Sequence, residues 1–221
     1  MSRLREFARA AAERQRSAER EAEPERCDLC GEPIPPGHRH LLDLESRELM
    51  CTCQPCRILF EGGAAGGGHY RLVPERRLRL DDFAMDDARW AELRIPVDMA
   101  FFFRHSGEGR VAAFYPSPAG PTESLLELDA WEELERDNPV LRELEPDVEA
   151  LLVNRARGAA QYLIVPIDDP YRLVALIRTR WRGFTGGKEV WEAIDEFFTD
   201  LAGRATTTTT TTREEAAWQT T

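Results

Sequence analysis

Apolar residues are spaced most regularly in the last third of the chain. Residues 161–167 (QYLIVPI) are rich in β-branched side chains and predict a buried strand. Two amphipathic stripes follow, each with the three- to four-residue spacing of one helix face. The first comprises Leu173, Val174, Ile177 and Trp181, and the second Val190, Trp191, Ile194, Phe197, Phe198 and Leu201. The pattern therefore predicts a strand followed by two helices.

The preceding stretch mixes strand and helix patterns. Residues 70–73 and 77–80 predict short strands, and residues 86–93 predict a short helix. Residues 99–105 and 110–115 flank a Ser-Gly-Glu-Gly turn and predict a hairpin. Residues 70–204 are accordingly expected to form a mixed α+β domain that ends in two helices.

The flanking segments lack core-forming patterns. Residues 1–26 place a few apolar side chains at helical spacing among Arg and Glu, which predicts an exposed helix. The Gly-rich residues 61–69 are expected to be a linker, since glycine holds regular structure poorly. Residues 205–221 contain a seven-threonine run without periodicity and predict a disordered tail.

The charge balance narrows the functional classes. Forty acidic residues against 29 Lys and Arg give a formal net charge of −11, which disfavours broad nucleic-acid binding. The longest apolar runs, such as residues 99–103, are far short of the roughly 18 residues of a membrane span. No secretory signal precedes residue 27, so a cytoplasmic protein is expected.

All five cysteines lie between residues 27 and 56, in the pattern C-x2-C-x20-C-x-C-x2-C. In a chain without a secretory signal such pairs bind metal more often than they form disulfides. Four thiolates at tetrahedral spacing favour zinc, with mononuclear iron as the alternative. The predicted ligands are Cys27, Cys30, Cys53 and Cys56.

The local sequence around each pair suits this chemistry. In CDLCG, Gly31 can adopt positive φ, which closes a tight turn behind Cys30. In CQPC, Pro55 suits the first turn of a helix. Between the pairs, HRHLLDLESRELMCT predicts a hairpin, so residues 27–60 are expected to form a zinc-ribbon or treble-clef module.

Three residues of this module have several interpretations. Cys51 is expected to be a small buried hydrophobe, an alternative ligand in place of Cys53, or a redox-exchangeable thiol. His38 and His40 alternate on one strand face, but four thiolates already satisfy a tetrahedral ion. The histidines are therefore expected to lie beside the metal site or at the surface.

The chain contains no nucleophile elbow, Rossmann fingerprint or HExxH motif, and whether the larger domain has enzymatic activity is left open. Asp168 and Asp169 directly precede Pro170 at the start of a predicted helix, so they are interpreted as capping residues and not as a catalytic pair.

Two long stretches, CDLCGEPIPPGHRHLLDLESRELMCTCQPC and QYLIVPIDDPYRLVALIRTRWRGFTGGKEVWEAIDEFF, resemble an uncharacterised, mainly actinobacterial family. The resemblance covers residues 27–202. Genes of this family often lie near those of NiFe hydrogenases. The resemblance therefore implies a role in hydrogenase assembly or maturation, with hydrogenase subunits or maturation factors as protein partners.

Three functions follow as expectations. The first is a non-enzymatic zinc-binding accessory protein acting through protein contacts. The second is a rubredoxin-like electron carrier with one iron; CDLCG resembles a rubredoxin knuckle, but Arg57 stands where the second knuckle needs glycine, which favours zinc. The third, a zinc-finger nucleic-acid binder, is disfavoured by the acidic charge.

Overall fold

A computed structural model describes residues 24–61, 65–126, 128–183 and 185–208. The chain divides into two compact units, Met1–Leu72 and Val73–Thr221, called here the N-terminal and C-terminal units. The predicted helix over residues 1–26 lies almost entirely outside the described residues, and so does the tail from residue 209 onward.

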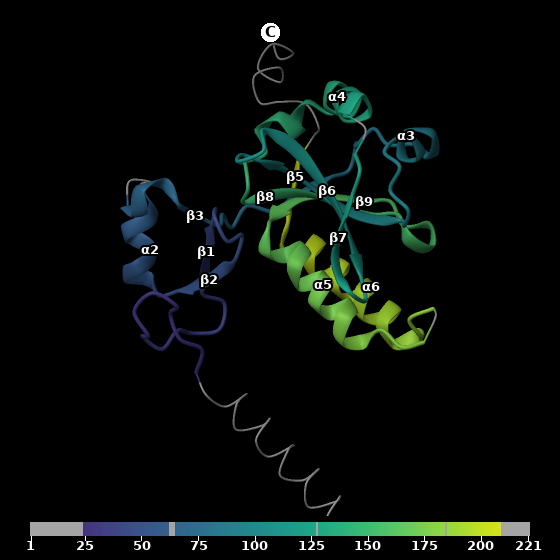
Figure 1. Ribbon diagram of the computed structural model, residues 1–221. Helices are drawn as coiled ribbons and strands as arrows, with labels where there is room; N and C mark the ends of the chain where they lie inside the picture. The colour runs from purple at the N-terminus through teal and green to yellow at the C-terminus, as the bar shows by residue number, and fades with distance from the viewer. Residues whose placement is uncertain (1–23, 62–64, 127, 184, 209–221) are drawn as a thin grey trace, which may run out of the picture. The chain divides into compact units, whose positions relative to one another are not determined.

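The N-terminal unit contains a three-stranded sheet in the order β2-β1-β3 (Figure 1). Strands β1 (Arg39–Asp43) and β2 (Leu49–Thr52) form the predicted antiparallel hairpin. Helix α2 (Gln54–Glu61) and the 3-10 turn η1 (Ala65–Gly68) lead to β3 (Tyr70–Leu72). Strand β3 pairs with β1, so residues 70–72 belong to the N-terminal unit. The sequence pattern had assigned them to the larger domain.

The C-terminal unit is built on a seven-stranded sheet in the order β10-β4-β9-β8-β5-β6-β7. All neighbouring strands are antiparallel except the pair β10 and β4. The strands are β4 (Leu78–Leu80), β5 (Met99–His105), β6 (Arg110–Ser117), β7 (Gly120–Ser124), β8 (Glu149–Asn154), β9 (Gln161–Pro166) and β10 (Thr206–Thr208). The predicted hairpin around residues 106–109 is thus present as β5 and β6.

Helices cover both faces of this sheet (Figure 1). On β5, Phe102 stacks on Trp131 of one helical layer, whereas its neighbour Phe101 contacts Tyr171 of the other. Alternate residues of a strand point to opposite faces, so the apolar run of β5 fills both cores. The first layer contains α3 (Asp87–Glu92), α4 (Leu128–Asp137) and η2 (Pro139–Glu143). The second layer contains α5 (Asp168–Arg180) and α6 (Lys188–Arg204). The short turn η3 (Ala156–Gly158) joins β8 to β9.

The mixed α+β class is confirmed, but the end of the C-terminal unit differs from expectation. Helices α5 and α6 are present, and the chain then continues into β10. The amide of Thr206 donates to the carbonyl of Arg77 at 2.9 Å, and residues 206–208 pair with β4. Threonine is β-branched and suits an edge strand, so the start of the predicted tail is ordered by this pairing.

Asp169 also differs from expectation, because it is not a helix cap. Its side chain is fully buried and pairs with Nε of Arg77 at 2.6 Å and with Nη1 of Arg172 at 3.2 Å. The residue at the N-cap position of α5 is Ile167, without a capping side chain. Asp169 therefore connects α5 to the residue that precedes β4.

No helix in the described part of the chain is long and apolar enough to cross a membrane.

Candidate metal centre

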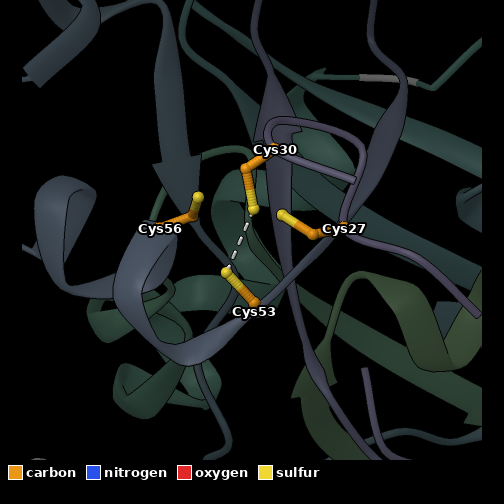
Figure 2. Close-up of side chains that lie close together, drawn as sticks. All are labelled: Cys27, Cys30, Cys53 and Cys56. Carbon is orange, nitrogen blue, oxygen red and sulfur yellow. Dashed lines mark hydrogen bonds between the residues drawn. The ribbon is translucent and has the colours of Figure 1, made fainter. Parts of the chain in front are cut away.

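Four cysteine side chains of the N-terminal unit converge on one point. The sulfur atoms of Cys27, Cys30, Cys53 and Cys56 all lie within 4.8 Å of one another, and Figure 2 shows them pointing inward from a turn and a helix start. The Sγ atoms of Cys30 and Cys53 are 3.6 Å apart. The structure thus brings together all four predicted ligands, called here the four-cysteine cluster.

Cys27 and Cys30 are placed by a tight turn. The amide of Gly31 donates to the carbonyl of Cys27 at 2.8 Å, and Gly31 has a φ of +75°. This left-handed conformation costs glycine little and strains other residues. The amide of Cys27 in turn donates to the carbonyl of Glu32 at 2.8 Å, so the turn is closed from both sides.

The second pair is placed by the start of helix α2. Cys53 immediately precedes the helix, and its carbonyl accepts the amide of Arg57 at 2.9 Å. Cys56 lies in the first turn, and Pro55, which lacks an amide hydrogen, is tolerated there. Both thiols therefore lie near the positive end of the helix dipole, which favours thiolates.

The electrostatics of the cluster favour a bound cation. Burial raises the pKa of Cys27, but backbone amide donors outweigh it and lower that pKa to about 6. For Cys56, burial and then the neighbouring sulfurs raise the pKa. The amide of Glu32 lowers the pKa of Cys30, yet the thiols of Cys27 and Cys53 raise it, and the net shift is upward. A second thiolate is thus disfavoured by the first unless a positive charge lies between them.

The spacing of the sulfurs fits a metal better than a disulfide. A tetrahedral zinc with Zn–S bonds of about 2.3 Å places its sulfurs about 3.8 Å apart. The 3.6 Å between Cys30 and Cys53 is close to this value and far from the S–S bond length of about 2.05 Å. All five cysteines are free thiols. The donor set therefore fits a thiolate-preferring ion such as zinc or iron.

A comparison with protein families shows where the chain belongs. Residues 26–205 match the model of a family of unknown function, DUF5947. The chain belongs to this family. The match in this DUF5947 protein begins one residue before Cys27 and includes the four-cysteine cluster together with every strand of the C-terminal unit up to β9. No curated protein and no solved structure matches the chain.

The structure places Cys51 outside the four-cysteine cluster. Its sulfur lies within 4.8 Å of a ring nitrogen of His38 and of His40, and the side chain is half-buried. Cys51 also packs against the buried group formed by Cys27, Ile34 and Cys53. The sequence pattern placed the two histidines on one strand face. It could not predict the β1–β2 register, which sets His40 opposite Cys51.

Proposed function

We infer that this DUF5947 protein is a zinc-binding accessory protein in which the four-cysteine cluster holds a structural zinc ion. The observation that carries this inference is the convergence of four thiols from a turn and a helix start, with Cys30 and Cys53 at 3.6 Å. Such closed four-thiolate sites contribute folding free energy and leave no coordination position open to a substrate.

Zinc is favoured over iron by the second cysteine pair. Cys53 and Cys56 are held by the first turn of a helix that continues to Glu61. A rubredoxin-like site needs a second tight turn closed by glycine, and the residue after Cys56 is Arg57, inside α2. Electron transfer through one iron is therefore the alternative function, and the elemental content and visible spectrum of the purified protein distinguish it from a zinc site.

The accessory role rests on surface chemistry and on the resemblance. Helix α2 exposes Ile58 and Leu59, at 56% and 65%, beside the cluster that its first turn helps to build. Adjacent exposed aliphatic side chains on a helix are typical of a protein contact surface. From the gene neighbourhood of the family that the chain resembles, the partner proposed is a NiFe hydrogenase subunit or maturation factor.

The metal is tested by purifying the full chain anaerobically without added metal and measuring its elemental content and visible spectrum. We expect a colourless protein that keeps about one zinc per chain through prolonged dialysis. A red protein that contains iron and bleaches on reduction would overturn the zinc assignment and establish the electron carrier instead.

The partner is tested separately, by recovering the tagged full chain from native extracts of its own source. We expect hydrogenase subunits or maturation factors to be recovered with it. A chain that elutes alone, in amounts matching its own expression, would contradict the accessory role without affecting the metal assignment.

A further inference from the structure

A second group of potential ligands lies beside the four-cysteine cluster, on the hairpin of the N-terminal unit. It contains His38, His40 and Cys51, and one donor atom of each lies within 4.8 Å of the other two. His40 and Cys51 are directly opposite each other in the β1–β2 register. His38 immediately precedes β1, and the centroid of its ring lies 4.9 Å from that of His40.

The ring of His38 is held in an orientation suited to a metal ligand. Its Nδ1 lies 3.2 Å from the carbonyl oxygen of Pro35 and 3.3 Å from a carboxylate oxygen of Glu25. Both neighbours are acceptors, so Nδ1 is the donor nitrogen in this arrangement, and in the neutral ring the lone pair is on Nε2. Metal-binding histidines are commonly fixed in this way, by a carbonyl or carboxylate on the other nitrogen.

The remaining nitrogen of His38 has no hydrogen-bond partner among the residues that the structure describes. Nε2 is buried, and the His38 side chain as a whole is only 8% exposed. A buried polar atom without a partner is rare in native proteins because it loses its hydration without compensation. Since Nδ1 is occupied, Nε2 is the atom through which His38 can bind an ion.

The surroundings favour a dication. Two carboxylates lie next to these side chains: Asp28 accepts the amide of Cys51 at 2.6 Å, and Glu25 lies 3.3 Å from Nδ1 of His38. Their negative charge attracts a positive ion, and the thiol proton passes to solvent when the sulfur binds that ion. The ring centroids of His38 and His40 are 4.9 Å apart at an interplanar angle of 70°, so the rings are not stacked face to face.

We propose that His38, His40 and Cys51 form a second metal site that binds Zn²⁺ through two imidazoles and one thiolate. A tetrahedral zinc places such donors about 3.3 to 3.6 Å apart, which modest side-chain rotations achieve here. Three protein ligands leave the fourth position open to water or to a donor from another molecule. With half-buried His40 and Cys51, this site exchanges its ion more readily than the four-cysteine cluster.

The test counts metal ions in the full chain after incubation with excess Zn²⁺ and desalting, with Co²⁺ substitution as a spectroscopic probe. We expect about two zinc ions per chain, one of them removed by a mild chelator. His38→Gln and His40→Gln should each remove the labile ion and leave the tight one. His69→Gln, which alters an exposed histidine of the same unit, should change neither.

Cys51→Ser provides a second, independent variant. It should abolish the labile site and remove the thiolate-to-cobalt charge-transfer intensity of one sulfur, whereas the four-thiolate spectrum persists. The second site would be refuted if the wild-type chain bound only one zinc, and if that zinc were lost in Cys30→Ser and kept in the histidine variants. The structural zinc of the four-cysteine cluster would then still stand. A single zinc lost in the histidine variants and retained in Cys30→Ser would instead overturn the structural role of the four-cysteine cluster.

Discussion

Asp28 and Cys51 are joined by two reciprocal hydrogen bonds. The amide of Cys51 donates to the Asp28 carboxylate at 2.6 Å, and the amide of Asp28 donates to the carbonyl of Cys51 at 2.9 Å. The two residues are far apart in the sequence, and their pairing fixes the turn that carries Cys27 and Cys30 against strand β2. It thereby sets the position of the first cysteine pair relative to the second.

Asp28→Ala should weaken zinc retention without removing a ligand. The Cys51 amide loses a charged acceptor, and the turn becomes less firmly positioned, so zinc transfer to a competing chelator should be roughly three- to tenfold faster. Stopped-flow mixing with a chromogenic chelator measures this rate. Glu32→Ala, at an exposed position of the same turn, is the matched control; equal rates in the two variants would contradict the role of Asp28.

Cys30→Ser should unfold the N-terminal unit. Structural zinc supplies about 10 kcal/mol or more of folding free energy in small modules, and three thiolates hold the ion far less tightly than four. We expect loss of the tightly bound zinc and rapid proteolysis within this unit. Cys51→Ser should keep that zinc and resist the protease, because Cys51 lies outside the four-cysteine cluster. Wild-type zinc content and protease resistance in Cys30→Ser would refute a structural zinc.

Zinc retention should depend on pH in a direction set by Cys27. The folded protein lowers the pKa of this thiol from 9.0 to about 6, so the thiolate's contribution to stability is full above pH 9 and lost as the pH falls through about 6. Protons compete for Cys27 near pH 6 and, because the pKa values of Cys30 and Cys56 are raised, for those two ligands at higher pH. We expect zinc retention to decrease as the pH falls, as a zinc-sensitive dye would record; retention that is unchanged or rises on acidification would argue against this account.

Arg77→Ala should destabilise the C-terminal unit by about 3 kcal/mol, because among the described residues the fully buried Asp169 then keeps only the partly exposed Arg172 as an ion-pair partner. Arg79→Ala, two residues further on, removes an exposed pair with Asp81 and should change stability far less. Urea denaturation followed by tryptophan fluorescence compares the two, since Trp90 and Trp131 lie in this unit's core. Equal midpoints would show that the buried pair contributes nothing.

Ile58→Asp combined with Leu59→Asp should abolish recovery of the protein partner while the tight zinc remains. Both side chains are exposed on α2, so the substitutions cost little in the free protein and place charges in an apolar contact. Leu125→Asp, at a position that is 92% exposed in the C-terminal unit, is the control. If the α2 variant recovered the partner as well as the wild type does, the contact surface would lie elsewhere on the protein.

The local chemistry of the metal centre could be read from the sequence. The two C-x2-C pairs, Gly31 and Pro55 were sufficient to predict a turn and a helix start that carry four thiols, because these constraints act within a few residues. Helical stripes and strand patterns likewise predicted α5, α6 and the β5–β6 hairpin, since side-chain periodicity follows directly from backbone geometry.

The long-range pairings, in contrast, became visible only in the folded chain. Strand β3 joins β1, and Thr206–Thr208 pair with β4, through backbone hydrogen bonds that carry no sequence signature. The same is true of Arg77 with Asp169. Cys51 illustrates the difference most clearly: the sequence left three interpretations of this fifth cysteine open, whereas the hairpin register places it opposite His40 and within reach of His38. Register depends on which residues of distant strands meet, and that is settled by packing of the whole unit.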